Sequence, residues 1–506
     1  MALMNRGRGH GPNGMAGVSR RPASMTKWRR GPEQVRCKAS KGEKKMGGAS
    51  VARLGRRGRE RAEPLWLLTE ADGNESPHPQ APAPALPLDR GQLQAQVCHI
   101  VIHRGDHYVS YHGMDEEIYI HDTSKGVDIR QKKIEGVRKY KAAAAADILD
   151  RAGARVTVAT ASEGLVVEAG HGVRFAADGR VAGLEAEEFD LIVLPGGMKG
   201  SANLGDCKQL EKMVRKHTQS GRLCAAIGAA PAMVLARWGV LKGFTATCHP
   251  ALLGRLGDDD GDRTVVTSQG VGTAIEFALE LVEQLYGELK AHEVAGPLYM
   301  RPQQGGKYSI QEYNQIQWKC TGTPRVLVPV ANGSEEMEAL NLIDVLRRAG
   351  ARVTVASVED TPRILTRHYK LNLIADVMLE QAAEMEFDLI VMPGGLPGAL
   401  KFTSSEKLVG MLKKQAESGR PYGAICASPA YVLEPHGLLK GKKATSFPPM
   451  AHLLTDQSAC EYRVVVDGNL ITSRAPGTAT EFALAIVEKL FGEEKAVALA
   501  KELVFM

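Results

Sequence analysis

The chain has 506 residues, of which 44% are hydrophobic and 24% are charged, a composition typical of a soluble globular protein with two or three domains. Its net charge of +6 is concentrated at one end, because residues 1–61 contain 17 Lys and Arg but only three Asp and Glu. The remaining residues therefore carry a net charge of −8, which excludes a basic nucleic-acid-binding body.

Eight cysteines without any Cys-x-x-Cys pair predict reduced thiols rather than a disulfide framework or a zinc finger. The best candidate for a membrane span, residues 223–241, contains Pro231 and Arg237. We interpret it as a buried turn followed by a helix, not as a transmembrane segment.

The N-terminal residues 1–46 are rich in Arg, Gly and Ser, and they contain no apolar core of about 7–15 residues, which excludes a secretory signal. An Arg-rich, acid-poor N-terminus is typical of organelle transit peptides, and residues 35–39 resemble a plastid processing site. We therefore predict import into the chloroplast; the alternatives are a disordered tail on a cytoplasmic protein or an incorrectly assigned chain start. Residues 74–88, rich in Pro and Ala, predict a linker, so we expect residues 1–92 to lie outside the folded domains.

Three segments recur in the same order, which indicates that the chain contains one domain twice. The segments Arg151–Ala159, Phe189–Gly197 and Gly272–Leu279 return as Arg348–Ala356, Phe387–Gly395 and Gly477–Leu484. A period of about 200 residues is too long for a solenoid. We expect two tandem domains, at residues 135–300 and 322–504. Residues 96–133 match nothing in the second copy, and their place in the fold is not predicted.

Each copy alternates apolar runs with helix-like stretches. In the second copy, Arg325–Val330 predicts a buried strand, and Glu335–Arg348 predicts a helix because its apolar residues recur every three to four positions. Val353–Ser357 and Asp388–Met392 predict further strands. Strands that alternate with helices indicate an α/β fold with a parallel sheet covered on both faces, whose chemistry lies at the carboxyl ends of the strands.

A single cysteine follows an apolar strand in the second copy, in the segment Tyr422-Gly-Ala-Ile-Cys-Ala-Ser-Pro-Ala430. A sharp turn from strand to helix would present Cys426 at the edge of the sheet, with small neighbours that allow close approach. The helix N-terminus would lower the pKa of the thiol and favour a thiolate nucleophile. The alternative is a buried structural cysteine, the commoner role of a lone cysteine.

Five motifs together make the chain resemble tandem, plant-type members of the DJ-1/PfpI family. They are Ala331–Glu338, Leu346–Gly350, Pro393–Gly395, Ala424–Ala430 and Thr472–Thr478. The resemblance is close over residues 322–504 and partial over residues 135–300. It implies two tandem flavodoxin-like, three-layer α/β/α domains with parallel sheets, of the class I glutamine amidotransferase-like type.

The resemblance also implies a reactive Cys426 beside Glu338, whose pKa burial would raise so that it donates a hydrogen bond to the sulfur. Backbone N–H groups of Gly395 and Ala427 would form an anion hole, supported by Gly394 and Ser428. Arg474 would lie near subunit contacts. For Glu338 and Arg474 the alternatives are ordinary surface residues.

The two copies depart from the family pattern in different ways. Some relatives have a His before the proline at position 448, where this chain has Phe447, so a Cys–His dyad is not expected, and His452 is expected at the surface. In the first copy, Gly228 replaces the cysteine and Lys141 replaces the glutamate, which predicts a catalytically inactive domain. That copy does have the histidine, His249, before Pro250.

What the resemblance implies for function is a glutathione-independent glyoxalase of the glyoxalase III type, a lyase that converts methylglyoxal or glyoxal to lactate or glycolate through a hemithioacetal on Cys426. The activity would reside in the second domain alone. The alternatives are a redox sensor or holdase chaperone that responds to oxidative stress, a protein deglycase, and a peptidase, which the missing histidine disfavours.

The expected partner is a small reactive dicarbonyl, and no metal, cofactor, nucleic acid or membrane is expected. The two copies are expected to pack as an intrachain pseudo-dimer, with further self-association possible.

Overall fold

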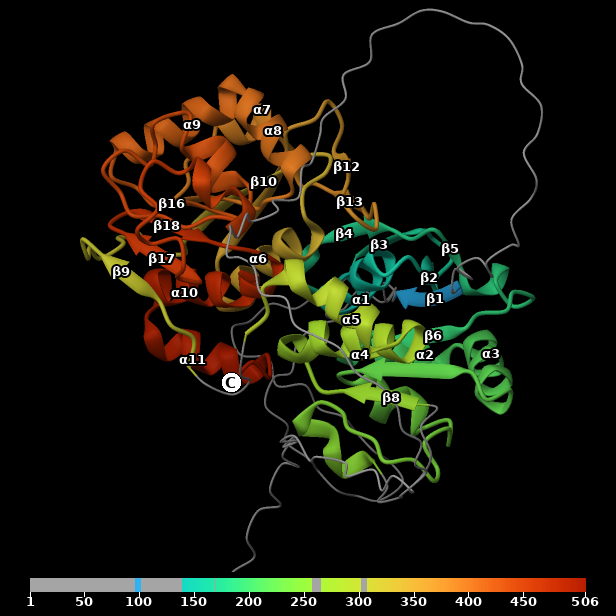
Figure 1. Cartoon of the computed structure of the whole chain (residues 1–506). Coiled ribbons are helices and arrows are strands. Elements are labelled where there is room, and N and C mark those ends of the chain that lie inside the picture. The colour runs from blue at the N-terminus through green and yellow to red at the C-terminus, as the bar shows by residue number, and fades with distance from the viewer. Residues whose placement is uncertain (1–95, 102–138, 169, 257–264, 302–306) are drawn as a thin grey trace, which may run out of the picture. The chain divides into compact units, whose positions relative to one another are not determined.

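The computed structural model describes residues 96–101, 139–168, 170–256, 265–301 and 307–506 (Figure 1). The proposed transit peptide and linker, and most of residues 96–133, lie outside these ranges. The helices are α1 Lys139–Arg151, α2 Met198–Asp206, α3 Lys208–Gln219, α4 Ala274–Tyr286, α5 Glu288–Ala295, α6 Glu336–Ala349, α7 Leu379–Ala383, α8 Leu396–Ser404, α9 Glu406–Glu417, α10 Ala479–Phe491 and α11 Glu493–Glu502.

The strands of the first repeat are β1 Gln96–Val101, β2 Arg155–Thr160, β3 Val166–Glu168, β4 Arg174–Ala176, β5 Gly179–Arg180, β6 Leu191–Leu194, β7 Leu223–Ile227 and β8 Val265–Ser268. Six of them form a parallel sheet in the order β5-β2-β1-β6-β7-β8. The central strand β1 lies upstream of residue 135. The fold of the first repeat therefore begins earlier in the chain than the segment whose sequence matches the second repeat.

The strands of the second repeat, together with one strand before it, are β9 Gln311–Tyr313, β10 Arg325–Val330, β11 Arg352–Ser357, β12 Arg363–Leu365, β13 Asn372–Ile374, β14 Val377–Met378, β15 Leu389–Met392, β16 Tyr422–Ile425, β17 Val464–Asp467 and β18 Leu470–Ser473. The main sheet has the order β14-β11-β10-β15-β16-β18-β17-β9, and β17 is antiparallel to β18. Figure 1 shows α7, α8 and α9 on one face of this sheet and α6, α10 and α11 on the other.

The central strands explain this three-layer arrangement. All four residues of β15 and of β16 are buried, as are the last five residues of β10. A strand covered on both faces must be apolar throughout, which is why these strands are continuous hydrophobic runs and do not alternate. The predicted fold class, two tandem α/β/α domains with parallel sheets, is confirmed.

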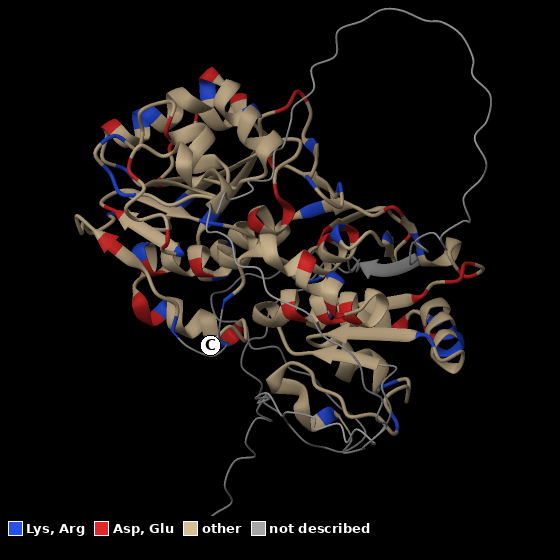
Figure 2. Cartoon of the chain, in the orientation of Figure 1, with Lys and Arg blue, Asp and Glu red and all other residues tan. Residues whose placement is uncertain are grey.

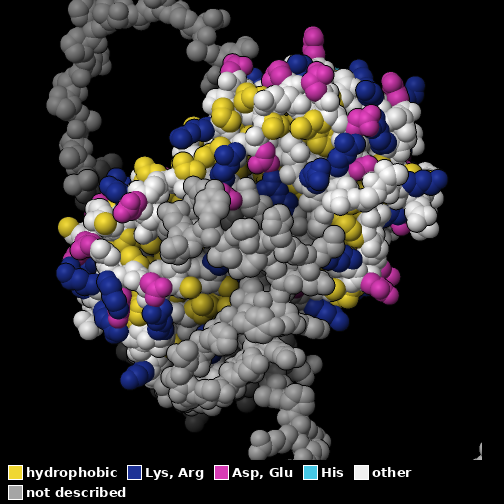
Figure 3. Space-filling view, turned by 180° about the vertical axis from the view of Figure 1, so that it is seen from behind, with side chains coloured by type: hydrophobic (Ala, Val, Ile, Leu, Met, Phe, Trp, Pro, Cys, Tyr) yellow, Lys and Arg dark blue, Asp and Glu magenta, His cyan; other side chains and the backbone are white. Residues whose placement is uncertain are grey.

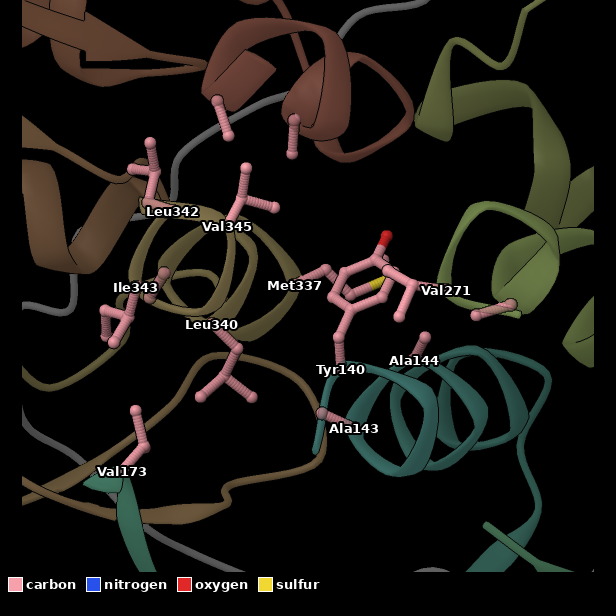
Figure 4. Packing of buried hydrophobic residues seen from close by; sticks show 14 of the residues in the cluster. Tyr140, Ala143, Ala144, Val173, Val271, Met337, Leu340, Leu342, Ile343 and Val345 are labelled. Carbon is pink, nitrogen blue, oxygen red and sulfur yellow. The ribbon is translucent and has the colours of Figure 1, made fainter. Parts of the chain in front are cut away.

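The two repeats share an apolar layer between α1 and α6. Figure 4 shows Tyr140 and Ala143 of α1 and Met337 and Leu340 of α6 within this layer. All four side chains are at most 7% exposed. A second connection is a four-stranded antiparallel sheet, β12-β13-β4-β3, in which β13 of the second repeat pairs with β4 of the first.

The surface of the described residues is of mixed charge. Lys and Arg are interspersed with Asp and Glu (Figure 2), and on the face turned away in that view the visible apolar side chains form small groups between charged ones (Figure 3). Within the described ranges, no helix combines the length and the hydropathy needed to cross a bilayer.

Candidate active site

Cys426 lies at the carboxyl end of β16, in the turn that leads to the short helical segment Pro429–Leu433. Its φ of 65° is in the left-handed region, which a non-glycine residue adopts only when its surroundings hold it there. The Cys426 N–H donates to the carbonyl of Ser473 at 3.0 Å, and its own carbonyl accepts the N–H of Phe447 at 2.8 Å. The strained turn is therefore held from both sides, as the predicted elbow requires.

Glu338 lies in the first turn of α6 and is completely buried. Its Oε2 accepts the N–H of Gly394 at 2.7 Å, and its carboxyl group lies beside the Cys426 thiol. Burial raises the pKa of Glu338 to about 7. The structure thus brings Glu338 and Cys426 together, and the carboxyl group titrates near neutral pH.

The Cys426 thiol does not have the lowered pKa that we expected from a helix N-terminus. Burial raises its pKa above the ordinary value, and the negative charge of Glu338 raises it further. The N–H of Gly395, hydrogen-bonded to the sulfur, opposes this shift. Because a carboxylate beside the sulfur repels a thiolate, the thiol and Glu338 hold at least one proton between them near neutral pH.

Two glycines allow the Pro393–Gly395 turn to approach the thiol. A Cβ on Gly394 would lie 2.4 Å from the Cβ of Cys426, and a Cβ on Gly395 would lie 2.2 Å from the carbonyl oxygen of Gly333. Gly395 also has a φ of 87°. No other residue type fits this path without displacing the backbone, so the glycines are needed for the N–H groups of Gly394 and Gly395 to face Glu338 and the sulfur.

Of the other predicted residues, Ala427 and Ser428 lie at the site and Arg474 lies beside it. Ala427 lines the same cavity as Cys426 and Gly395. The buried Ser428 hydroxyl donates to the carbonyl of Pro393 at 2.6 Å and so ties the elbow to the glycine turn. Arg474 donates to the carbonyl of Glu461 and lies over the ring of Tyr299, at 5.5 Å from its centroid.

A cavity of about 370 Å³ opens onto Cys426. Its lining combines residues of the second repeat with four residues that precede it: Arg151, Glu293, Val294 and Pro297. From the second repeat, Arg367 and His368 line the cavity. Burial lowers the pKa of His368 to about 3, aided by the charges of Arg151 and Arg367, so this histidine is neutral at physiological pH.

An aromatic side chain occupies the place where some relatives have a histidine. Phe447 lines the cavity, and its ring meets that of Tyr299 edge-on at 5.7 Å. His452 is exposed, as expected. A phenyl ring cannot accept a proton from the thiol, so Glu338 is the acid–base group nearest to Cys426 among the described residues.

The first repeat contains the same turn without the same chemistry. Gly228 has a φ of 74°, its N–H donates to the carbonyl of Ser268, and its carbonyl accepts the N–H of His249, each at 2.8 Å. A Cβ on Gly228 would lie 2.0 Å from the Nζ of Lys141, which is 1% exposed. The lysine amine thus occupies the place that the Glu338 carboxyl group occupies beside Cys426.

Sequence reasoning missed the charged residues that surround this pair. Arg151, Arg367 and His368 come from different elements, and no local motif marks them. One signal was available: the acidic segment Glu335-Glu336-Met337-Glu338 aligns with the basic segment Arg138-Lys139-Tyr140-Lys141. Asp147, Glu335 and Glu336 form a buried carboxylate group that could hold a cation, but Arg151 already donates to two of these three residues.

The family model described as "DJ-1/PfpI family" matches residues 133–284 and 324–489. The chain belongs to the DJ-1/PfpI family. Its relatives include "Protein DJ-1 homolog B" of Arabidopsis thaliana, which is 54% identical over 374 residues, or 72% of this chain and 85% of that protein. "Glutathione-independent glyoxalase DJR-1.2" of Caenorhabditis elegans is 36% identical over 180 residues, or 35% of this chain and 94% of that protein.

Among solved structures of DJ-1 proteins, "Toxoplasma gondii DJ-1, oxidized" is 43% identical and covers 36% of this chain and 99% of its own, with a TM-score of 0.35. Drosophila melanogaster DJ-1beta is 41% identical with the same coverage and TM-score.

Proposed function

We propose that the second repeat is a glutathione-independent glyoxalase of the glyoxalase III type that converts methylglyoxal to lactate. The observation that carries this proposal is the juxtaposition of Cys426, which lines the cavity together with Gly395, and the buried Glu338 carboxyl group behind it. A family relative that bears the name of this activity supports it.

The reaction begins when the Cys426 sulfur attacks the aldehyde carbon and forms a carbon–sulfur bond. Glu338 takes the thiol proton as the bond forms and then passes it to the new alkoxide, so that a neutral hemithioacetal results and Glu338 returns to its carboxylate form. The N–H groups of Gly395 and Ala427 stabilise the alkoxide while it carries charge.

In the next step, the same carboxylate moves a proton between the two substrate carbons. Glu338 removes the C–H proton of the hemithioacetal carbon and returns it to the adjacent carbon, while the hydroxyl proton of the first carbon moves to the oxygen of the second. The first carbon is thereby oxidised and the second reduced without any external oxidant. The product is a thioester, and its hydrolysis releases lactate and regenerates the Cys426 thiol. A carboxyl group with a pKa of about 7 suits this shuttle, because it both accepts and donates a proton readily at neutral pH.

The test is lactate formation from methylglyoxal by the full chain without glutathione. Cys426→Ala should lower the rate by at least about three orders of magnitude, because the covalent intermediate cannot form. Cys460→Ala is the matched control, since Cys460 is also a buried cysteine of the second repeat but does not line the cavity. Lactate formation that survives in Cys426→Ala protein would refute the mechanism.

A redox sensor is the second candidate, and the polar groups beside the Cys426 sulfur favour it. Oxidation to a sulfinate adds oxygens beside the Gly395 N–H and the Glu338 carboxyl group, both able to donate to them when Glu338 is protonated. Mass spectrometry after mild peroxide treatment should then find Cys426 oxidised before the other thiols. Oxidation of the other cysteines with Cys426 unchanged would count against this role.

A further inference from the structure

The first repeat, which has a glycine where the second has Cys426, forms part of the cavity wall at Cys426. Arg151 is the last residue of α1, and it lines the cavity together with Glu335. Its side chain is 14% exposed, whereas that of Glu335 is 3% exposed. A buried carboxylate is costly unless a cation or hydrogen-bond donors compensate it, so the contacts of this pair matter for the site.

Arg151 joins the two repeats through one guanidinium group. Its Nε donates to Oδ2 of Asp147 at 2.8 Å, within α1, and its Nη2 donates to Oε1 of Glu335 at 2.7 Å, across the repeat interface. The other carboxylate oxygen of Glu335, Oε2, accepts the N–H of Glu338 at 2.7 Å and caps α6. An uninterrupted series of contacts therefore runs from Arg151 through Glu335 to Glu338 and the Cys426 thiol.

The equivalent arginine of the second repeat makes no such contact. Arg348 pairs with Asp344 at 2.9 Å, as Arg151 pairs with Asp147, but its Nη1 donates to Glu502, which lies within the same repeat. The position equivalent to Glu335 in the first repeat is Arg138 in the sequence, so no carboxylate is available there. Of the two arginines at equivalent positions, only Arg151 therefore faces a carboxylate that caps the helix of the acid–base residue.

We propose that Arg151 is a positioning residue for the Cys426 site: its ion pair with Glu335 fixes the first turn of α6 and holds the Glu338 carboxyl group against the thiol. The first repeat then contributes a residue to the site, although it has no nucleophile of its own. The activity measurements below rest on the proposed glyoxalase function, whereas the alkylation measurements do not.

The charges around Glu338 come from several elements, and all of them bear on its titration. Glu335 and Glu336 belong to the start of α6, Asp147 and Arg151 to α1, and Arg367 and His368 to the segment after β12. Of these groups, only Arg151 and Arg367 are cationic, and both favour the charged form of Glu338. Loss of Arg151 removes one of two cations, so both Glu338 and the thiol should ionise at higher pH.

The first experiment measures the pH dependence of Cys426 alkylation by iodoacetamide in the full chain, followed by mass spectrometry. In Arg151→Gln the midpoint should move to higher pH, and the rate at pH 7 should fall about ten-fold. In the matched control Arg348→Gln, which loses the same local aspartate pair, the midpoint should stay where it is. Equal midpoints in the wild type and Arg151→Gln, or equal shifts in both variants, would overturn the proposal.

A double-mutant cycle tests the route through Glu335. If Arg151 acts through this carboxylate, Arg151→Gln combined with Glu335→Gln should slow alkylation no more than the stronger single substitution does. Additive effects would contradict that route. Arg151→Lys, which keeps the charge and one of the two contacts, should restore part of the alkylation rate, and it replaces Arg151→Gln if the latter does not fold.

Turnover of methylglyoxal separates positioning from substrate binding. A positioning role predicts that Arg151→Gln lowers kcat about ten-fold with little change in KM, whereas a substrate-binding role would raise KM and leave kcat unchanged. If the wild-type protein forms no lactate, the proposed function fails, and the alkylation shift still decides whether Arg151 positions Glu338.

Discussion

Glu338 and Lys141 occupy equivalent positions in the two repeats, and both are almost completely buried. The acid faces a thiol, whereas the amine lies where the Cβ of Gly228 would be if that residue were a cysteine. A buried ionisable group is costly in both cases. At the residue scale, the two repeats therefore differ by two linked substitutions. A thiol at position 228 would also require that the lysine side chain be removed.

The raised pKa of Glu338 predicts that the free energy of unfolding depends on pH. A carboxyl group whose pKa is raised from 4.5 to about 7 on folding stabilises the native state below pH 4.5, and that contribution is lost as the pH rises toward and through 7. Glu338→Gln removes this dependence. The free energy of unfolding of Glu338→Gln minus that of the wild type should therefore rise by up to about 3 kcal/mol as the pH is raised from 4.5 to 8.

Urea denaturation at several pH values measures this difference, and Glu406→Gln in the first turn of α9 is the control because its side chain is at the surface. A difference that stays constant with pH would mean that Glu338 does not titrate in this range.

In the methylglyoxal assay, the Glu338 carboxylate acts as a base, so the rate of lactate formation should rise as the pH rises through about 7.

The residues of the site were predictable to different degrees. Cys426, Glu338 and the two glycines stand in motifs that resemble the family, so the sequence located all of them. The pKa of the thiol was expected to fall and instead rises, because it depends on burial and on the nearby Glu338 charge, which no linear pattern displays. Arg151 and Arg367 reach the cavity only through the tertiary fold.

At the scale of elements, the run Ala142–Ala146 in α1 has a structural reason. All five alanines are at most 7% exposed, because α1 packs against both α4 and α6. Small side chains allow helices to approach closely, and larger ones would force them apart. An alanine run also favours helix in any context, but it does not show which helices pack against it.

Ala144→Leu should therefore destabilise the protein by about 1–3 kcal/mol, since the added atoms have no space in the layer shown in Figure 4. Chemical denaturation followed by circular dichroism measures the change. The matched control is Ala498→Leu in α11, where the alanine is exposed and the same substitution should change the stability by less than about 0.5 kcal/mol. Equal stability of the two variants would show that α1 tolerates a wider spacing.

The strands of the two main sheets could be predicted from the sequence to different degrees. The apolar runs of β10, β15 and β16 predict central parallel strands, and the structure has them there. The strand β1 takes the place of β10 in its sheet, but it was not predicted because 37 residues separate it from α1, whereas five separate β10 from α6. The three-residue strand β9, which precedes the second repeat and extends its sheet beside β17, was missed because so short a polar segment has no detectable periodicity.

At the scale of the whole molecule, each repeat covers a loop of the other with the residues that follow its last long helices. The N–H of Gly272 in the first repeat donates to the carbonyl of Leu503 at 2.8 Å, and a Cβ on Gly272 would lie 2.5 Å from the carbonyl oxygen of Val504. In the reciprocal contact, a Cβ on Gly477 would lie 2.4 Å from the carbonyl oxygen of Leu298. These reciprocal contacts support the proposal that the repeats form an intrachain pseudo-dimer.

The last four residues of the chain should therefore stabilise the first repeat. Leu503 is completely buried, and Arg301 lies over the ring of Phe505 at 4.6 Å from its centroid. Deletion of residues 503–506 removes the buried leucine side chain and breaks the bond to Gly272, so we expect a loss of at least about 2 kcal/mol. Thermal and urea denaturation measure this loss, and deletion of Met506 alone is the control. If the longer deletion leaves stability unchanged, the repeats are held together by the α1–α6 layer and the shared sheet without help from the C-terminus.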